Sequence, residues 1–359
     1  MAHPDRVFDN ARMRAAGDSP NLYGLDRAGL AAALLSFSIP GYRVRQVFSA
    51  LYRRDALDPR TWSDLPVSLR ESLADSFVIE RPRIASRVRA DDGTTKFALD
   101  LPGGGRVESV AIPADDRMTF CISSQVGCAF GCAFCMTAKL GFTRNLTAGE
   151  IAGQVAALIA ETGVEHGEYN IVYMGMGEPL HNFDGVKGSL HLLFDELGFA
   201  LGPKRVTVST VGLPKQIRAL ASEPVPPRLA VSLVTADQAL RESLMPVARK
   251  FKLDELCDAI RAFGEGKRER PTLEVVMLGG VNDAPSLAAP LAEYARRARA
   301  KVNLIEFNPT PELPYVPASE ERIAHFLRVL TRAGVVGTVR RSRGKDAFAA
   351  CGQLAFLER

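Results

Sequence analysis

The chain has 359 residues, of which 47% are hydrophobic and 24% are charged, a composition typical of a folded globular protein. Its 45 basic and 41 acidic residues leave a net charge of +4 at pH 7, too small to indicate a nucleic-acid partner by itself. No stretch approaches the ~18 uninterrupted apolar residues of a membrane helix, and residues 1–18 are charged where a secretory signal needs an apolar core. We therefore expect a soluble cytoplasmic protein.

The first 80 residues predict a small helical domain. Apolar residues recur three and four positions apart in three segments, as on the buried face of a helix. These segments are 27–36, 42–54 and 69–77. We expect 1–80 to form a helical N-terminal domain.

The pattern changes after residue 80 to short β-rich segments separated by glycine-containing turns. These segments are 84–90, 96–101 and 106–112. We expect a short β meander, or linker, at 81–113.

Strand-like and helix-like patterns alternate over 114–359. The strand-like segments are 119–123, 171–174, 205–210, 228–233, 273–278, 301–307 and a last one at 335–340. Repeated β-then-α units predict parallel strands joined by right-handed crossovers, in either an open doubly wound sheet or a barrel with fewer than eight units. Both architectures place function at the carboxyl ends of the strands.

Three cysteines follow the first of these strands in a C-x3-C-x2-C motif, at Cys128, Cys132 and Cys135. Three thiolates so close together repel one another and therefore need a positive centre. A structural zinc site takes four ligands, usually from two separated pairs, and no second pair is present. A [4Fe–4S] cluster held by three thiolates keeps one iron free for a small molecule. The spacing favours the cluster, with zinc as the alternative.

This cysteine spacing resembles that of the radical S-adenosylmethionine (SAM) enzymes, and four further segments resemble the RlmN/Cfr family of RNA adenosine methyltransferases. The segments are 121–128, 141–147, 174–179 and the pair 340–344 with 350–354. The resemblance extends from about residue 22 to residue 354. It implies an α/β fold with a partial (β/α)6 TIM-like barrel of the radical SAM type, preceded by the helical domain and the meander.

The resemblance also implies the catalytic residues. Cys351 would take a methyl group from one SAM molecule, and a 5′-deoxyadenosyl radical from a second SAM molecule would remove hydrogen from that methyl group. The methylene radical would add to an adenine, Glu108 would accept the ring proton, and Cys121 would release the RNA through a transient disulfide bond with Cys351. Without the resemblance, Glu108 would be interpreted as a solvated carboxylate on a strand.

The cofactors implied are a [4Fe–4S] cluster on Cys128, Cys132 and Cys135, and SAM as both methyl donor and radical source. The implied contacts of SAM lie at or after the ends of successive strands. They are Gly177, Glu178, Ser209, Ser232, Leu233, Val234 and Asn308. The chain departs from the family at Val234, where the pattern predicts a histidine.

The implied substrate is 23S rRNA, and possibly tRNA, methylated at C2 of an adenosine. An electron donor such as flavodoxin or ferredoxin and a monomeric state are expected. The helical domain 1–80, as a domain of the RNA-binding type, could form a phosphate-binding surface together with the basic residues of 81–89 and of the loop 340–345. Two alternatives stay open: methylation at C8, as in Cfr-like enzymes, and a zinc-stabilised RNA-binding protein without enzymatic activity.

Overall fold

The computed structural model describes residues 19–114 and 117–356, and the chain separates between Glu80 and Arg81 into two compact units. None of the helices in the described part of the chain is long and apolar enough to cross a membrane. Each unit is described by itself below.

The N-terminal unit is helical, as the apolar periodicity predicts. Its helices are α1 (Arg27–Ala33), α2 (Gly41–Tyr52) and α3 (Val67–Ser76). The Asp26 side chain caps α1 by accepting from the N–H of Gly29. Helix α2 supplies the core with Val47, Phe48 and Leu51, none of which is exposed to solvent.

The strands of the second unit form one large sheet and one hairpin. Their bounds are β1 (Arg83–Arg89), β2 (Thr95–Asp100), β3 (Arg106–Ala114), β4 (Arg117–Cys121), β5 (Gln125–Gly127), β6 (Phe142–Asn145), β7 (Tyr169–Tyr173), β8 (Val206–Thr210), β9 (Arg228–Ser232), β10 (Thr272–Met277), β11 (Lys301–Glu306) and β12 (Gly337–Arg340). Among the described residues, the order in the large sheet is β1-β2-β3-β4-β7-β8-β9-β10-β11-β12.

This sheet has two halves. From β4 through β7 to β12 every neighbouring pair is parallel, whereas β1, β2, β3 and β4 pair antiparallel. Strand β4 belongs to both, because it runs antiparallel to β3 and parallel to β7. The parallel half confirms the predicted partial barrel, and the strands of the meander continue the same sheet.

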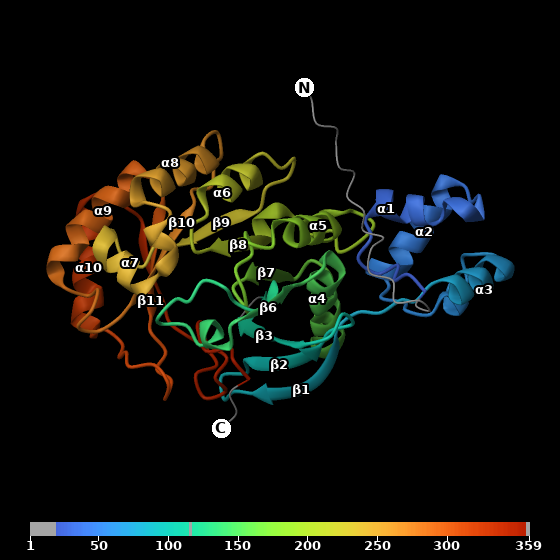
Figure 1. The fold of residues 1–359 in the computed structure, drawn as a ribbon, viewed down its shortest axis with the longest axis horizontal. Helices are drawn as coiled ribbons and strands as arrows, with labels where there is room; N and C mark the ends of the chain where they lie inside the picture. Colours follow the sequence, from blue (N-terminus) through green and yellow to red (C-terminus); the bar gives the residue numbers. More distant parts are fainter. Residues whose placement is uncertain (1–18, 115–116, 357–359) are drawn as a thin grey trace. The chain divides into compact units, whose positions relative to one another are not determined.

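Helices connect the parallel strands and lie along their outer side (Figure 1). They are α4 (Ala148–Thr162), α5 (Phe183–Phe194), α6 (Pro214–Ala221), α7 (Gln238–Leu244), α8 (Leu253–Gly264), α9 (Ala288–Arg297) and α10 (Glu320–Arg332). Helix α4 begins with a capping box, in which the Thr147 hydroxyl accepts from Glu150 N–H and the Glu150 carboxylate accepts from Thr147 N–H.

The hairpin of β5 and β6 carries the cysteine motif in the loop between its strands. Cys128 follows β5 directly, and its N–H donates to the carbonyl of Gly141 at 2.8 Å, which closes the loop. Gly127 has φ of 73°, and a Cβ there would lie 1.8 Å from the Gly141 oxygen. Glycine is therefore required for the two ends of the loop to approach.

Candidate active site

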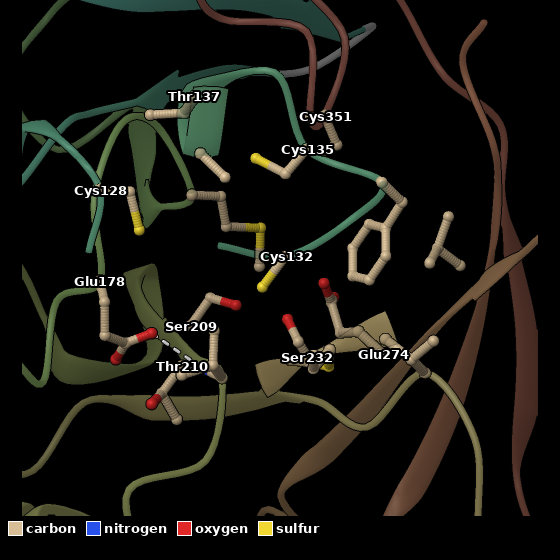
Figure 2. Close-up of a pocket in the computed structure, with 18 of the residues that line it drawn as sticks. Cys128, Cys132, Cys135, Thr137, Glu178, Ser209, Thr210, Ser232, Glu274 and Cys351 are labelled. Carbon is tan, nitrogen blue, oxygen red and sulfur yellow. Dashed lines mark hydrogen bonds between the residues drawn. The ribbon is translucent and has the colours of Figure 1, made fainter. Parts of the chain in front are cut away.

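A cavity of about 170 Å³ lies at the carboxyl ends of the parallel strands and is lined by most of the predicted site residues. They are Cys128, Cys132, Cys135, Gly177, Glu178, Ser209, Ser232, Val234 and Cys351. The cysteine loop supplies one wall, and the strand ends of β8 and β9 supply the opposite one. Figure 2 shows the three thiols and the Glu178 and Ser232 side chains directed into the same space.

The three thiols of the motif are largely buried, and each resists ionisation. Burial raises the pKa of Cys128 to about 11. Burial, reinforced by the neighbouring thiols Cys135 and Cys128, raises the pKa of Cys132 well above its ordinary value. Burial also raises the pKa of Cys135, although N–H groups of Ala138 and Thr137 oppose it. Thiolates at these positions therefore require a strong positive centre.

An iron–sulfur cluster meets this requirement. Among the described residues, no three His, Cys, Asp or Glu side chains are grouped so as to hold a metal ion, yet the three thiols line one cavity. A cluster of several irons is larger than a single ion, and the thiolates that bind it are correspondingly further apart. The donor set and the size of the cavity fit a cluster with three thiolate ligands.

Glu178 faces the cysteines from the loop after β7. Its carboxylate accepts hydrogen bonds from Leu180 N–H at 2.9 Å and Val211 N–H at 2.8 Å, and the second of these is drawn in Figure 2. Burial raises the pKa of Glu178 to about 7, although the Thr210 hydroxyl and the two N–H groups oppose this rise. Within residues 19–114 and 117–356, no lysine or arginine is in salt-bridge contact with this carboxylate, so it is suited to a ligand's ammonium group.

Two glycines before Glu178 allow its loop to lie against the end of β4. A Cβ on Gly175 would lie 2.6 Å from Ser123 Oγ, and one on Gly177, whose φ is 94°, would lie 2.5 Å from Gln125 Cβ. The Gln125 side chain in turn accepts from Glu178 N–H at 2.8 Å. The spacing Gly175-Met-Gly-Glu178 is thus explained by close backbone approach.

The predicted SAM contacts separate into two groups. Ser209, Ser232 and Val234 line the cavity, whereas Leu233 is wholly buried and does not. The carbonyl of Leu233 accepts from Nε of Arg241, and the same guanidinium donates to the carbonyl of Val211 at 2.7 Å. Arg241, which the sequence did not suggest, therefore holds the strand ends of β8 and β9 together.

Val234 stands where the family pattern has histidine, and its backbone is unusual. Its φ is 67°, a conformation that is strained for a β-branched residue. Its N–H donates to the carbonyl of Glu274 at 3.1 Å, and its own carbonyl accepts from Asn282 Nδ2 at 2.9 Å. The surrounding hydrogen bonds hold this conformation in place.

Cys351 and Cys121 line a second pocket of about 210 Å³, which adjoins the first through Cys351 and Met174. Arg340 lies in the same pocket. Burial raises the pKa of Cys121 to about 12; the Cys351 thiol adds to the rise and Arg340 opposes it. The guanidinium is thus the cation that favours thiolate character here.

The segment around Cys351 is fastened to the cysteine loop and to Asn308. The N–H of Met136 donates to the carbonyl of Gly352 at 2.8 Å, and the Thr137 hydroxyl donates to the carbonyl of Leu354 at 2.6 Å. Asn308 Nδ2 donates to the carbonyl of Cys351 at 3.4 Å, and Asn308 Oδ1 is buried without a partner among the described residues. Asn308 is therefore placed to contact Cys351 and a ligand together.

The structure contains no disulfide bond among the described residues, because all six cysteines are free thiols. A standing bond between Cys121 and Cys351 is therefore not supported. Cys257 is buried on α8, as expected of a core thiol.

Glu108 is not a solvated carboxylate, as its strand position alone suggested, because it is only 2% exposed. It lines neither of the two pockets above. Its carboxylate pairs with Lys96 at 2.9 Å and accepts from the N–H of Phe356 at 3.1 Å. Lys96 is a second residue that the sequence did not suggest.

The basic loop 340–345 differs from the expected phosphate-binding cluster. Arg341 pairs with Glu320 at 2.7 Å and Lys345 with Glu306 at 2.9 Å. Arg343 donates to the carbonyl of Pro113, and Arg340 faces the two thiols. The cations of this loop thus have partners within the protein.

Comparison with known proteins decides the family. Residues 122–289 match the Radical SAM superfamily. A probable dual-specificity RNA methyltransferase RlmN of Gemmatimonas aurantiaca is 46% identical over 315 residues, which cover 88% of this chain and 86% of that protein. The chain belongs to the RlmN family. A further RlmN relative, from Salinibacter ruber, is 40% identical and covers 98% of both chains.

A solved structure is also similar to this chain over most of its length. The crystal structure of a radical SAM methyltransferase from Sphaerobacter thermophilus is 42% identical, with a TM-score of 0.87, and covers 93% of this chain and 99% of that one. The chain is thus a radical SAM RNA methyltransferase of the RlmN family, and this membership implies a [4Fe–4S] cluster and SAM.

Proposed function

We propose that the protein methylates C2 of an adenosine in 23S rRNA, and also in tRNA, with the methyl group passing through Cys351. The observation that carries this proposal is the placement of two free thiols, Cys351 and Cys121, in one pocket that adjoins the cavity of the three cluster thiols. One thiol can carry a carbon group, and the other can release it.

The residues of the cavity that contains the three clustered thiols have separate tasks in this proposal. Cys128, Cys132 and Cys135 hold the cluster. Glu178 accepts the ammonium group of SAM, and Gly177, Ser209, Ser232 and Val234 line the space for the rest of that molecule. Leu233 and Asn308 lie outside this lining and support the strand end and the segment of Cys351. Bound together, the cluster and SAM supply a carbon radical that can remove hydrogen from an unactivated methyl group. Adenine C2 is electrophilic, so direct transfer from a sulfonium cannot methylate it.

Cys351 accepts a methyl group as its thiolate and carries it as S-methylcysteine. After hydrogen removal, its methylene radical adds to C2 and links the RNA to Cys351, and the adduct radical then gives up one electron, for which the bound cluster would be the acceptor. Glu108 accepts the proton from C2, and the electron pair of the C2–H bond stays with the ring. The Cys121 thiolate then attacks the Cys351 sulfur, the bond from that sulfur to the methylene carbon breaks, and the freed carbon takes up a proton to give the methyl group. A two-electron reductant reopens the transient disulfide.

The partners follow from this chemistry. An RNA loop with an unstacked adenosine presents C2 to the site, and a small electron carrier such as flavodoxin or ferredoxin reduces the cluster. The protein acts in the cytoplasm as a monomer.

The test is an assay of anaerobically reconstituted protein on protein-free 23S rRNA, and separately on tRNA, with mass analysis of the digested nucleosides against 2-methyl- and 8-methyladenosine standards. We expect 2-methyladenosine from both substrates. The 8-methyl product would establish the Cfr-like alternative, and the absence of any methylated adenosine from wild-type enzyme that cleaves SAM would refute the proposal.

The metal content of the reconstituted protein separates the proposed function from the zinc alternative. If the protein holds an iron–sulfur cluster, it should contain iron and acid-labile sulfide and absorb broadly in the visible range. Colourless protein with one bound zinc would support the alternative without enzymatic activity.

A further inference from the structure

A fully buried ion pair lies on the antiparallel strands, outside the two pockets already described. Lys96 on β2 and Glu108 on β3 approach to 2.9 Å, and their side chains are 4% and 3% exposed. Burying two charges costs free energy that their mutual attraction returns only in part. A gain in stability therefore does not explain why the pair is present. Its position in the sheet suggests a functional role.

The register of the strands places the pair beside Cys121. Lys96 faces Val110 across β2 and β3, and Val110 faces Cys121 across β3 and β4. Glu108 lies two residues from Val110 and therefore on the same face of the sheet. Diagonal neighbours in such a sheet have Cβ atoms ~7 Å apart, so Glu108 is a diagonal neighbour both of Lys96 and of Cys121, the thiol that releases RNA.

The rest of Glu108 is fixed by the two segments that border the reaction. Its carbonyl accepts from Ser123 Oγ at 2.6 Å, just beyond β4. Its N–H contacts the Met176 sulfur at 3.3 Å, in the loop that carries Glu178. Its second carboxylate oxygen accepts from the N–H of Phe356, five residues after Cys351. The carboxylate is thus held from both sides.

Other cations near Glu108 have different partners. Arg87 and Arg106 line the same pocket of about 370 Å³ as Lys96 and Glu108, but Arg87 pairs with Glu161 and Arg106 pairs with Asp100. Within the described part of the chain, Lys96 is the cation in salt-bridge contact with the Glu108 carboxylate.

We propose that Lys96 is a positioning residue for Glu108, which orients the carboxylate to take the C2 proton of the RNA adduct. This inference rests on the proposed function, in which the adduct radical has already given up one electron. When the C2–H bond then breaks, its electron pair stays with the ring and the proton bonds to a Glu108 oxygen. Lys96 therefore acts on the release of RNA, after methyl transfer to Cys351 and after SAM cleavage.

The experiment uses reconstituted full-length enzyme and measures 5′-deoxyadenosine, methylation of Cys351, covalent protein–RNA adduct and free methylated RNA in the same reaction. The variants are Lys96→Met, Lys96→Gln and Lys96→Arg. Lys252→Met is the matched control, because Lys252 pairs with Glu242 on the surface. Dividing each rate by 5′-deoxyadenosine formation corrects for any loss of folded protein.

We expect both neutral variants to form adduct and to release methylated RNA at least ~30-fold more slowly, the loss that a charge-assisted contact supplies. Lys96→Arg should recover release to within ~10-fold of wild type, and Lys252→Met should match wild type. Release at the wild-type rate by either neutral variant overturns the inference. Equal losses of Cys351 methylation and of release in all three variants also overturn it, because they indicate a purely structural role. Wild-type enzyme that forms neither adduct nor product refutes the proposed function instead.

Discussion

Two buried carboxylates, Glu178 in the parallel half of the large sheet and Glu108 in the antiparallel half, have different kinds of hydrogen-bond partner. Glu178, in the parallel half, accepts from backbone N–H groups at the strand ends. Glu108, in the antiparallel half, pairs with a buried lysine from the neighbouring strand. Parallel strands bring their carboxyl ends to one edge, where loops converge, whereas antiparallel strands bring side chains together on one face.

The difference suits different tasks. A carboxylate satisfied only by neutral donors can exchange its proton for a cationic ligand, as the contact with SAM demands. A carboxylate that already pairs with a lysine side chain is a poor ligand site, but the pair holds its oxygens in a fixed orientation. Strand β4 joins the halves and ends at Cys121, so the releasing thiol stands between the ligand site and the proton acceptor.

The largest expected loss of RNA methylation follows replacement of Cys351, because residues of both halves of the sheet take part in its proposed chemistry. Cys351→Ala should abolish adduct and methylated RNA, while the cluster and SAM cleavage persist, because the methyl carrier is lost and the ligands are not. Cluster absorbance, 5′-deoxyadenosine and product are measured together. Cys257→Ala, a change in the core of α8, should methylate RNA normally. Methylation by Cys351→Ala at the wild-type rate would refute the carrier role.

The next effect is at Cys121, on the strand that both halves share. Cys121→Ala should add the methylene group to RNA and then stop, because no thiol is left to attack the Cys351 sulfur. Covalent protein–RNA complex, resolved on a denaturing gel and removed by nuclease, is the measurement. Free, fully methylated RNA from this variant would contradict the assignment.

The third prediction concerns the pH dependence of stability, to which the buried carboxyl group of Glu178 contributes. Burial raises the pKa of Glu178 from 4.5 to about 7, so the folded apoprotein keeps a proton that the unfolded chain releases. Its contribution to stability is complete below pH 4.5 and is lost as the pH rises through 7, by about 3 kcal/mol in all. Urea unfolding at pH 5 and pH 8 should show this loss in wild type and not in Glu178→Gln. The same change in the free energy of unfolding between pH 5 and pH 8 in wild type and in Glu178→Gln would disprove this prediction.

The smallest effect concerns Glu150, which links the halves from α4. Its carboxylate accepts from Arg144 at 2.7 Å and from the N–H of Gly103, in the turn between β2 and β3. Burial opposes ionisation, but Arg144 and the N–H groups of Thr147 and Gly103 outweigh it and lower the pKa of Glu150.

Glu150→Gln should therefore destabilise the protein by about 2 kcal/mol at pH 7. The difference from wild type should shrink as the pH falls through the lowered pKa of Glu150, because the wild-type carboxylate then protonates. Unfolding curves at pH 7 and pH 3 measure this difference. Glu242→Gln, at an exposed pair, is the control and should not differ measurably from wild type.

Much of the fold could be predicted because local signals and tertiary packing agree. The alternation of strand and helix patterns predicted the parallel half, and Thr147 was recognisable as a helix cap from its residue type and the Glu three positions later. The meander was seen as strands, but a periodicity of two cannot show which neighbour a strand pairs with. The continuation of the sheet from β3 into β4 therefore needed the structure.

The candidate site likewise contains residues that the sequence predicted and residues that only the structure revealed. The three cluster thiols, Glu178 and Cys351 stand in recognisable motifs, and the structure places them around one cavity. Arg340 and Lys96 carry no motif, because their importance comes from register and burial. Arg340 seemed to belong to an exposed basic loop, and only its position beside Cys121 and Cys351 shows its electrostatic role.

The hydrogen bonds that fasten Met136 and Thr137 to the segment of Cys351 join parts of the chain that are far apart in sequence, 217 positions in the case of Thr137 and Leu354. Residues 136 and 137 follow directly after Cys135, so the methyl carrier is anchored to the loop that bears the three clustered thiols. A substitution that displaces this loop is therefore expected to displace the carrier as well.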